Sequence, residues 1–151
     1  MSSTAHQFAI TEQELRDLLS QVSSVQHYGF RLESFADGEC VIRVPYQKNL
    51  ERPGGILGGQ VFMAAADVAM WLAILTRLGP RDGSVTAEMK TNFLSAARRE
   101  DILCQARVLK LGRRLIYGVA ECTTPEKKLL THHTITYIRP DSGKLDGGGV
   151  L

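Results

Sequence analysis

The feature that most constrains this chain is a long apolar run with one carboxylate at its middle. Residues 61–75 (VFMAAADVAMWLAIL) hold a single ionisable side chain, Asp67, among alanines, methionines and branched aliphatic residues. The run is shorter than the roughly 20 residues that a membrane span needs. It is apolar on every face, whereas a helix resting on a flat sheet keeps a polar stripe. The run therefore predicts a buried central helix, wrapped by a sheet or by a sheet and a partner subunit.

The remaining pattern predicts one α+β domain over residues 1–151, with an antiparallel sheet around that helix. Near the start, Thr11 and Glu14 have the spacing of a capping box and open an amphipathic helix. Two strand-like runs then flank Asp37-Gly38, which is a strong hairpin signal.

The second half of the chain is expected to be mostly strand. Residues 47–59, rich in Gly and Pro, read as a loop before the central helix, and Gly79-Pro80 marks the end of that helix. Four strand-like runs follow, at residues 84–96, 101–112, 114–124 and 128–140. Their short separators predict that successive runs pair as antiparallel neighbours. Both chain ends, about 1–10 and 141–151, are expected to be loose.

Charge and cysteine content argue against nucleic-acid, membrane and metal partners. A formal net charge of +2 gives no strong field toward nucleic acid or a membrane, so neither is expected as a partner. The chain has 3 cysteines without a C-x-x-C pair and begins without a secretion signal, which favours reduced thiols in the cytoplasm. His132 and His133 are adjacent on a strand and so face opposite sides of the sheet, where they cannot share a metal. No metal site is expected.

Asp67 leaves two interpretations open. In the structural one, its carboxylate accepts backbone N–H bonds from a neighbouring loop, or pairs with Arg52 or Lys90. In the functional one, it is a catalytic base or nucleophile at the wall of a cleft. The preceding GGILGG segment favours the second, because a glycine-rich helix start exposes unpaired N–H groups to a ligand oxygen.

The distance between these two features implies a dimer. Asp67 lies about two turns after the first glycines of the helix, or roughly 10–12 Å at about 1.5 Å per residue. One reacting carbonyl cannot touch both within a single chain. An Asp from one chain that faces the helix start of another would solve this, so the site is expected at a subunit interface.

The segment RPGGILGGQVFMAAADVAMWLAIL and the strands after it resemble the hotdog-fold acyl-CoA thioesterases of the phenylacetic-acid-pathway type, over about residues 25–139. In that family a His-Gly-Gly turn leads into the central helix, and an acid stands nine positions after the His. Here Asp67 matches the acid, and Gly59 and Gln60 take the two glycine positions. The RPGG form of the loop looks like a bacterial subgroup of unassigned substrate.

The sequence departs from the family pattern at two polar positions. Gly58 stands where the His belongs, and Arg52 takes the place of a usual Asn, although Asn49 is close by. Thr86 matches a Ser or Thr that the partner subunit offers to the water or the thioester.

The resemblance implies a five- or six-stranded antiparallel sheet wrapped on one long helix, and a homodimer with a continuous sheet, often doubled into a tetramer. It also implies hydrolysis of a small, medium-chain or aromatic acyl-CoA, with no metal and no cofactor besides the CoA of the substrate. Asp67 would act as base or nucleophile, the Gly59 N–H as oxyanion donor, and Thr86 would position the water or the carboxylate. Substrate contacts would come from Arg52, Gly58, Gln60, Arg113 and Arg114.

Several alternatives stay open. Arg113 and Arg114 belong to a cluster of cations at strand ends, which is either a solvated turn or a rim for the phosphates of CoA. The same fold also supports hydration or dehydration of a 3-hydroxyacyl thioester, and a protein that binds acyl-CoA without catalysis.

Overall fold

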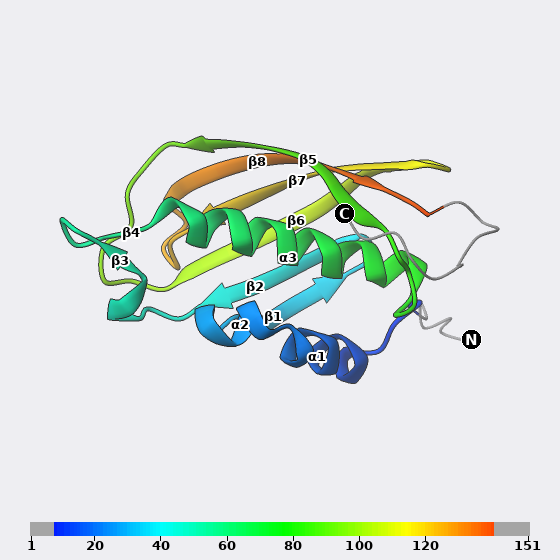
Figure 1. The fold of residues 1–151 in the computed structure, drawn as a ribbon, viewed down its shortest axis with the longest axis horizontal. Coiled ribbons are helices and arrows are strands. Elements are labelled where there is room, and N and C mark those ends of the chain that lie inside the picture. The colour runs from blue at the N-terminus through cyan, green and yellow to red at the C-terminus, as the bar shows by residue number, and fades with distance from the viewer. Residues whose placement is uncertain (1–7, 141–151) are drawn as a thin grey trace, which may run out of the picture.

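The computed structural model describes residues 8–140, in which a six-stranded antiparallel sheet curls around one long helix (Figure 1). Two short helices lie beside the first strands of the sheet. This arrangement confirms the predicted fold class. The expectation of loose ends at residues 1–7 and 141–151 lies outside the described residues.

Residues 8–10, which were also expected to be loose, pack against the body of the protein. The Ala9 N–H donates to the Thr76 carbonyl oxygen at 3.2 Å, and the Ile10 side chain is buried. This backbone bond ties the start of the described chain to the far end of the central helix.

The N-terminal helix forms as its capping signal predicts. Helix α1 spans Glu12–Gln21; the Thr11 Oγ1 accepts from the Glu14 N–H at 3.2 Å, and the Thr11 N–H donates to the Glu14 carboxylate at 2.8 Å. A separate short helix α2, Ser23–Tyr28, then ends at Gly29 in the left-handed conformation.

Strands β1 (Arg31–Ala36) and β2 (Glu39–Val44) form the predicted hairpin. Its turn is fastened to the central helix, because the Gly38 N–H donates to the buried Thr76 hydroxyl at 2.8 Å. The Arg77 guanidinium also pairs with the Asp37 carboxylate at 3.2 Å.

The segment predicted as a plain loop contains more structure than expected. A 3₁₀ turn, η1 (Lys48–Leu50), leads into a small antiparallel ribbon of β3 (Glu51–Arg52) and β4 (Ile56–Leu57). The turn of the ribbon is the PGG segment, in which Gly54 and Gly55 have φ angles of 103° and 75°. Only glycine adopts such angles readily, so two adjacent glycines permit the ribbon to close.

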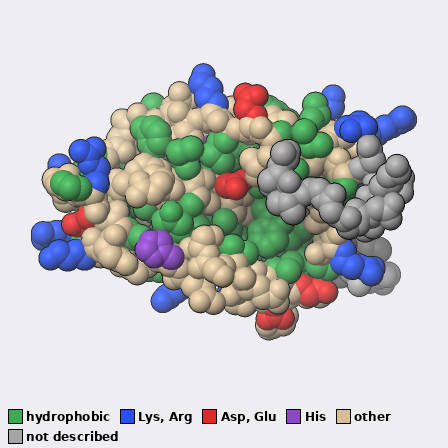
Figure 2. Space-filling model, viewed as in Figure 1, with side chains coloured by type: hydrophobic (Ala, Val, Ile, Leu, Met, Phe, Trp, Pro, Cys, Tyr) green, Lys and Arg blue, Asp and Glu red, His purple; other side chains and the backbone are tan. Residues whose placement is uncertain are grey.

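Helix α3 (Gly59–Leu78) is the central helix, and Gly79 ends it as predicted. By length and composition it is the one helix within residues 8–140 that could span a membrane, but here it is the core helix that the sheet encloses. One side is less covered than the rest: Met63 is exposed, and Asp67 and Trp71, each one turn further on, are half-buried. Figure 2 shows this face, where hydrophobic side chains gather around an acidic one.

Helix and sheet lie close together at Gly118. A Cβ atom at this position would lie 2.4 Å from the Met70 Cε of α3 and 2.6 Å from the Arg107 carbonyl oxygen of the neighbouring strand. The absence of a side chain therefore sets the spacing between α3 and the middle of the sheet.

The four C-terminal strands are β5 (Val85–Phe93), β6 (Ile102–Leu111), β7 (Leu115–Thr123) and β8 (Leu129–Ile138). The strand order is β1-β2-β6-β7-β8-β5, so the predicted pairing of the first run with the second is wrong. The segment between them leaves the sheet, with the Ala97 carbonyl oxygen accepting from the Leu57 N–H at 3.1 Å. Strand β5 instead pairs with β8 and forms an open edge, with 61% of Val85 and 55% of Phe93 exposed.

The three cysteines are free and buried between the sheet and the helix. One of them, Cys40, makes the stability of the fold depend on pH. Burial raises the pKa of the Cys40 thiol from 9.0 to about 12. The unfolded thiol ionises above pH 9 while the folded one stays protonated, so stability falls as the pH rises from 9 to 12. Replacing Cys40 with Ala should remove about 2 kcal/mol of the stability loss between pH 8 and pH 10.5.

Urea unfolding of wild type and Cys40→Ala at both pH values measures this difference. The smaller side chain lowers stability at both pH values, so the informative quantity is the change between them. Equal alkaline losses in the two proteins would contradict the assignment to Cys40.

Candidate functional site

The lone carboxylate of α3 is held by two hydroxyl groups. The Thr86 Oγ1, on β5, donates to the Asp67 Oδ1 at 2.6 Å, and the Tyr137 hydroxyl, on β8, donates to the same oxygen at 2.7 Å. Tyr137 also lies 2.9 Å from the Asp67 backbone carbonyl oxygen. The structural interpretation expected backbone N–H donors, Arg52 or Lys90, and none of these contacts is present in residues 8–140.

The structure joins Asp67 and Thr86, both predicted as site residues, within one chain. Thr86 was expected to position either the water or the carboxylate, and its contact with the Asp67 oxygen is the geometry that the second role requires. Asp67 itself is half-buried on the less covered side of α3, so its carboxylate remains within reach of a ligand.

Tyr137 was missed by the sequence reasoning. Burial, together with the charge of Asp67, raises the pKa of Tyr137 well above its ordinary value of 10.0, so its hydroxyl keeps its proton. Strand periodicity could have found it: in β8, Ile135 and Tyr137 alternate with more exposed neighbours and so point toward the helix. A polar side chain in such an inward position is a candidate partner for a buried acid.

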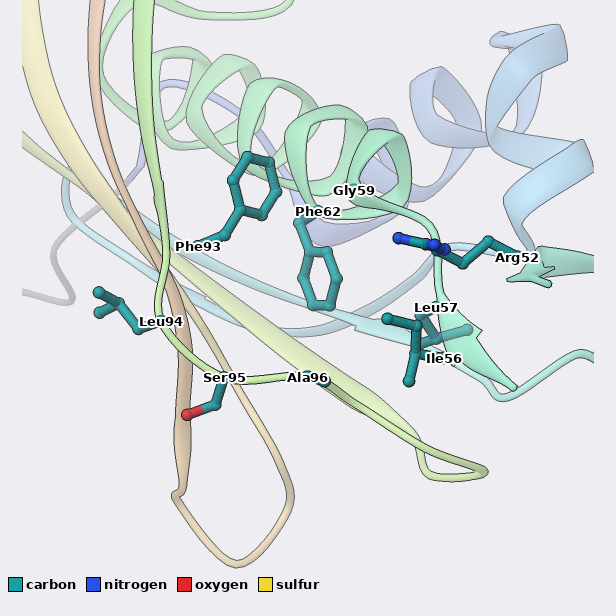
Figure 3. A pocket seen from close by; sticks show the side chains of 9 residues that line it. All are labelled: Arg52, Ile56, Leu57, Gly59, Phe62, Phe93, Leu94, Ser95 and Ala96. Atoms are coloured by element: carbon teal, nitrogen blue, oxygen red, sulfur yellow. The ribbon is translucent and has the colours of Figure 1, made fainter. Parts of the chain in front are cut away.

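A separate pocket of about 380 Å³ lies at the start of α3 (Figure 3). Its walls are mostly apolar: Ile56, Leu57, Phe62, Phe93, Leu94 and Ala96 line it, with Ser95, Gly59 and Arg52. The rings of Phe62 and Phe93 meet edge to face with centroids 6.4 Å apart. Arg52 reaches from β3 toward the first turn of the helix near Gly59 (Figure 3). Within residues 8–140 its guanidinium makes no hydrogen bond or ion pair.

The pocket reaches the helix start but not the acid. Gly59 lies at its wall, whereas Asp67 and Thr86 do not line it. The eight residues between Gly59 and Asp67 correspond to about 12 Å along a helix. The helix start and the carboxylate are therefore separate within one chain, which is the separation that the sequence predicted.

Gln60 occupies the space that a side chain at position 58 would need. A Cβ atom built on Gly58 would lie 2.5 Å from the Gln60 Oε1 and 2.8 Å from its Nε2. The N-cap residue Gly58 supplies no side-chain hydrogen bond to the helix, so the first N–H groups of α3 receive no side-chain cap from it. The Gln60 amide is the polar group beside Gly58 at this helix start, which has no side-chain cap.

Arg113 and Arg114 lie in the turn between β6 and β7, at the opposite end of the sheet from the pocket. The Arg114 carbonyl oxygen accepts from the Arg139 N–H at 2.8 Å, which places the turn beside the end of β8. Within one chain, neither arginine is brought to Gly59 or to Arg52.

The buried histidine has a satisfied structural environment. His133 Nδ1 lies 2.8 Å from the Thr91 hydroxyl, and its Nε2 lies 2.7 Å from the Thr131 hydroxyl. His132 points to the other face and is half-exposed, as strand alternation predicts. Between residues 8 and 140 no group of three or more His, Cys, Asp or Glu side chains is placed to hold a metal ion.

The Asp67 carboxylate and the start of α3 are suited to different parts of one reaction. One oxygen of the Asp67 carboxylate takes both hydroxyl donors, and the other has no hydrogen-bond partner in the described part of the chain. A helix start without a side-chain cap, with the Arg52 side chain in the same pocket, lies elsewhere on the same helix. A carboxylate of this kind can accept a proton or attack an electrophilic carbon, and a helix start can stabilise an oxyanion.

Comparisons with known proteins agree with this reading of the fold. Residues 54–131 match the sequence profile of the Thioesterase superfamily. A protein of Saccharolobus solfataricus, named "Putative esterase SSO1253", is 34% identical over 103 residues, which make up 68% of this chain and 68% of that protein.

Two solved structures extend the comparison to three dimensions. Thioesterase HI1161 of Haemophilus influenzae superposes with a TM-score of 0.82 at 24% identity, over 91% of this chain and 95% of that one. The PaaI protein of the Escherichia coli phenylacetic acid degradation operon gives a TM-score of 0.77 at 15% identity, over 85% and 92% of the two chains. At these identities the likeness concerns the fold alone. Membership of an RPGG-loop subgroup stays a prediction.

Proposed function

We propose, from the premise that this chain belongs to the thioesterase superfamily, that it hydrolyses the thioester of an acyl-CoA at a site shared by two copies of the chain. The single observation that carries this proposal is the arrangement of α3. A carboxylate held by two hydroxyls lies on its less covered side, and an uncapped helix start with an apolar pocket lies about two turns away.

A second copy would bring the two halves together. Strand β5 is an edge of the sheet and has unpaired backbone groups that favour association with another strand. Antiparallel pairing of two β5 strands about their middle residue, Met89, would set Thr86 of one copy opposite the partner subunit's Asn92, next to the partner subunit's Phe93. Because Phe93 lines the pocket next to Gly59, the Asp67 of one copy would face the pocket of the other.

The reaction then follows from two groups. The thioester carbonyl oxygen would lie against the Gly59 N–H of one copy, where the helix dipole favours negative charge. Asp67 of the other copy would take a proton from water, whose oxygen bonds to the acyl carbon while the C–S bond breaks. The CoA thiolate would then receive that proton, and the carboxylate is regenerated. Direct attack by Asp67 to give a mixed anhydride, hydrolysed in a second step, uses the same geometry.

The pocket supports an acyl group of modest size. A volume of about 380 Å³ with two phenylalanine rings suits a small, medium-chain or aromatic acyl group. The Gln60 amide over Gly58 offers a polar contact near the carbonyl, where the family pattern has a His. In the paired dimer, Arg113 and Arg114 of one copy come toward the partner's pocket and supply cations for the CoA phosphates.

The direct test is an assay of the purified protein against acyl-CoAs that differ in length and aromaticity. Released CoA is followed with a chromogenic thiol reagent, to which the protein contributes little because Cys40, Cys104 and Cys122 are buried. We expect turnover well above a protein-free control with at least one substrate. Absence of turnover across the panel contradicts the proposal. Tight acyl-CoA binding with the thioester intact would instead support a binding protein.

Arg52 provides a test of substrate contact. Replacing it with Gln should raise KM for acyl-CoA by about 10-fold or more and change kcat little, because charge-assisted hydrogen bonds to phosphate contribute about 1.5–3 kcal/mol. The increase should disappear with an acyl N-acetylcysteamine thioester, which lacks the phosphates. Arg107→Gln, an exposed change on β6 away from the pocket, is the matched control. An unchanged KM in Arg52→Gln rules out this role.

A further inference from the structure

The two hydrogen bonds to Asp67 are unevenly distributed over its carboxylate. Both hydroxyls, Thr86 at 2.6 Å and Tyr137 at 2.7 Å, donate to Oδ1. The other oxygen, Oδ2, has no hydrogen-bond partner within residues 8–140. Two donors on different strands fix the position of Oδ1, and the second oxygen is left without a hydrogen bond to the strands.

The single proton of the Tyr137 hydroxyl belongs to this carboxylate. The hydroxyl lies 2.7 Å from the Asp67 Oδ1 and 2.9 Å from the Asp67 backbone carbonyl oxygen, but it has only one hydrogen to donate. The carbonyl oxygen lies inside α3, where it already accepts an N–H bond from the next turn. The charged oxygen is both nearer and the stronger acceptor, so it takes the proton.

The surrounding structure holds the hydroxyl in place. Thr86 and Tyr137 are directly opposite each other in the β5–β8 register, so both donors are fixed relative to one another by backbone pairing. Tyr137 is only 3% exposed, which keeps water from replacing its contact. This is a rigid support for a half-buried acid on a third element, α3.

We propose that Tyr137 is a positioning residue for the reaction: its hydroxyl, with that of Thr86, fixes Asp67 through Oδ1 so that Oδ2 is the atom that meets the water or the acyl carbon. The inference rests on the proposed function and deepens it, since it assigns the reactive oxygen and a residue outside the family pattern. Tyr137 does not touch the substrate; it acts through Asp67.

The polar groups that contact the Asp67 carboxylate are the two hydroxyls, and the nearby charged side chains of β5 face away from it. On β5, Met89 packs against the core and Thr91 binds the buried His133, so strand alternation turns Glu88 and Lys90 to the opposite face. On β8 the titratable group that faces Asp67 is Tyr137 itself.

The experiment replaces each hydroxyl without changing the shape of its side chain. Tyr137→Phe and Thr86→Val should each lower kcat by about 10- to 100-fold, the size expected for one hydrogen bond to a charged group, and leave KM within about twofold. Thr86→Ser, which keeps the hydroxyl, should retain most of the activity.

Coupling to Asp67 separates positioning from a general structural role. In an Asp67→Asn background, Tyr137→Phe should change the residual rate by less than about twofold, because the group it positions is gone. Tyr117→Phe removes a hydroxyl from the outer face of β7 and is the matched control, with activity expected to be unchanged. Equal losses of kcat in the wild-type and Asp67→Asn backgrounds overturn the proposal, as does a Tyr137→Phe protein with wild-type kcat.

One measurement needs no substrate. The ¹³C chemical shift of the Asp67 carboxyl, measured by NMR at one pH, should differ between Tyr137→Phe and wild type, because the carboxylate loses a hydrogen-bond donor. Identical shifts in the two proteins overturn the hydrogen-bond assignment. Wild-type protein that hydrolyses no thioester refutes the proposed function, while the NMR result still decides for or against the Tyr137 contact.

Discussion

Replacing Asp67 with Asn should lower kcat by about 100-fold or more, while the protein stays folded. The change removes the charge that accepts a proton or attacks the acyl carbon, and general-base catalysis contributes about 10²- to 10⁴-fold. The amide oxygen of Asn can still accept the hydroxyls of Thr86 and Tyr137, so the local hydrogen bonds persist. Substrate binding should hold or improve, because a carboxylate near the acyl group is costly to desolvate.

Steady-state kinetics, acyl-CoA binding and thermal melting on one preparation separate the possible outcomes. Asp17→Asn is the matched control, since Asp17 is a helix carboxylate that accepts a neutral donor, Gln13, at 2.8 Å and lies on the exposed face of α1. A structural role for Asp67 predicts the reverse pattern. An Asp67→Asn protein that melts lower yet keeps its turnover per folded molecule would exclude Asp67 as the catalytic group.

Replacing Gly118 with Ala should cost about 3 kcal/mol in the free energy of unfolding, at the upper end of typical overpacking effects. The added Cβ would lie 2.6 Å from the Arg107 carbonyl oxygen and 2.4 Å from the Met70 Cε. The methionine can rotate away, but the carbonyl belongs to the backbone of β6 and cannot move without disturbing the sheet. Either β7 or α3 must shift.

Urea unfolding measures this loss, and Gly83→Ala is its control. At Gly83 the nearest atom to an added Cβ is the Pro140 Cγ at 3.5 Å, which is ordinary van der Waals contact. That change should be neutral or slightly stabilising, because Ala restricts the unfolded chain. Wild-type stability in Gly118→Ala would mean that helix and sheet are not in contact at this point.

Local signals in the sequence were sufficient for the helices and the hairpin. The Thr11–Glu14 capping box, the Asp37-Gly38 turn and the Gly79 helix end each depend on a few neighbouring residues, and each forms as predicted. The order of strands depends instead on which segments meet across the whole fold. The short separators correctly predicted that β6 pairs with β7 and β7 with β8. They could not predict that β5 lies at the far edge, beside β8.

In the candidate site, too, the features set by local geometry could be predicted, and those set by contacts across the fold could not. The separation of Gly59 and Asp67 could be predicted because helical rise is a fixed property of the backbone. The contact between Asp67 and Thr86 was expected only as one of two roles of Thr86. Strand alternation marks Tyr137 as an inward-facing residue of β8, but its contact with Asp67 depends on where β8 crosses α3, which no local signal reveals. Arg52, expected as a substrate contact from the family resemblance, lines the pocket, and its role there stays a prediction.

The position of β5 at the edge also determines when the sheet can finish folding during synthesis of the chain. Strand β5 leaves the ribosome before β6, β7 and its own neighbour β8, so it must wait for the last strand of the sheet. Such distant pairings form slowly, because a long loop has to close before they contribute. Until then Thr86 has no register partner, Asp67 has no Tyr137 beside it, and the edge of the sheet does not exist. An incomplete chain therefore has neither the support of its acid nor the surface on which a second copy could pair.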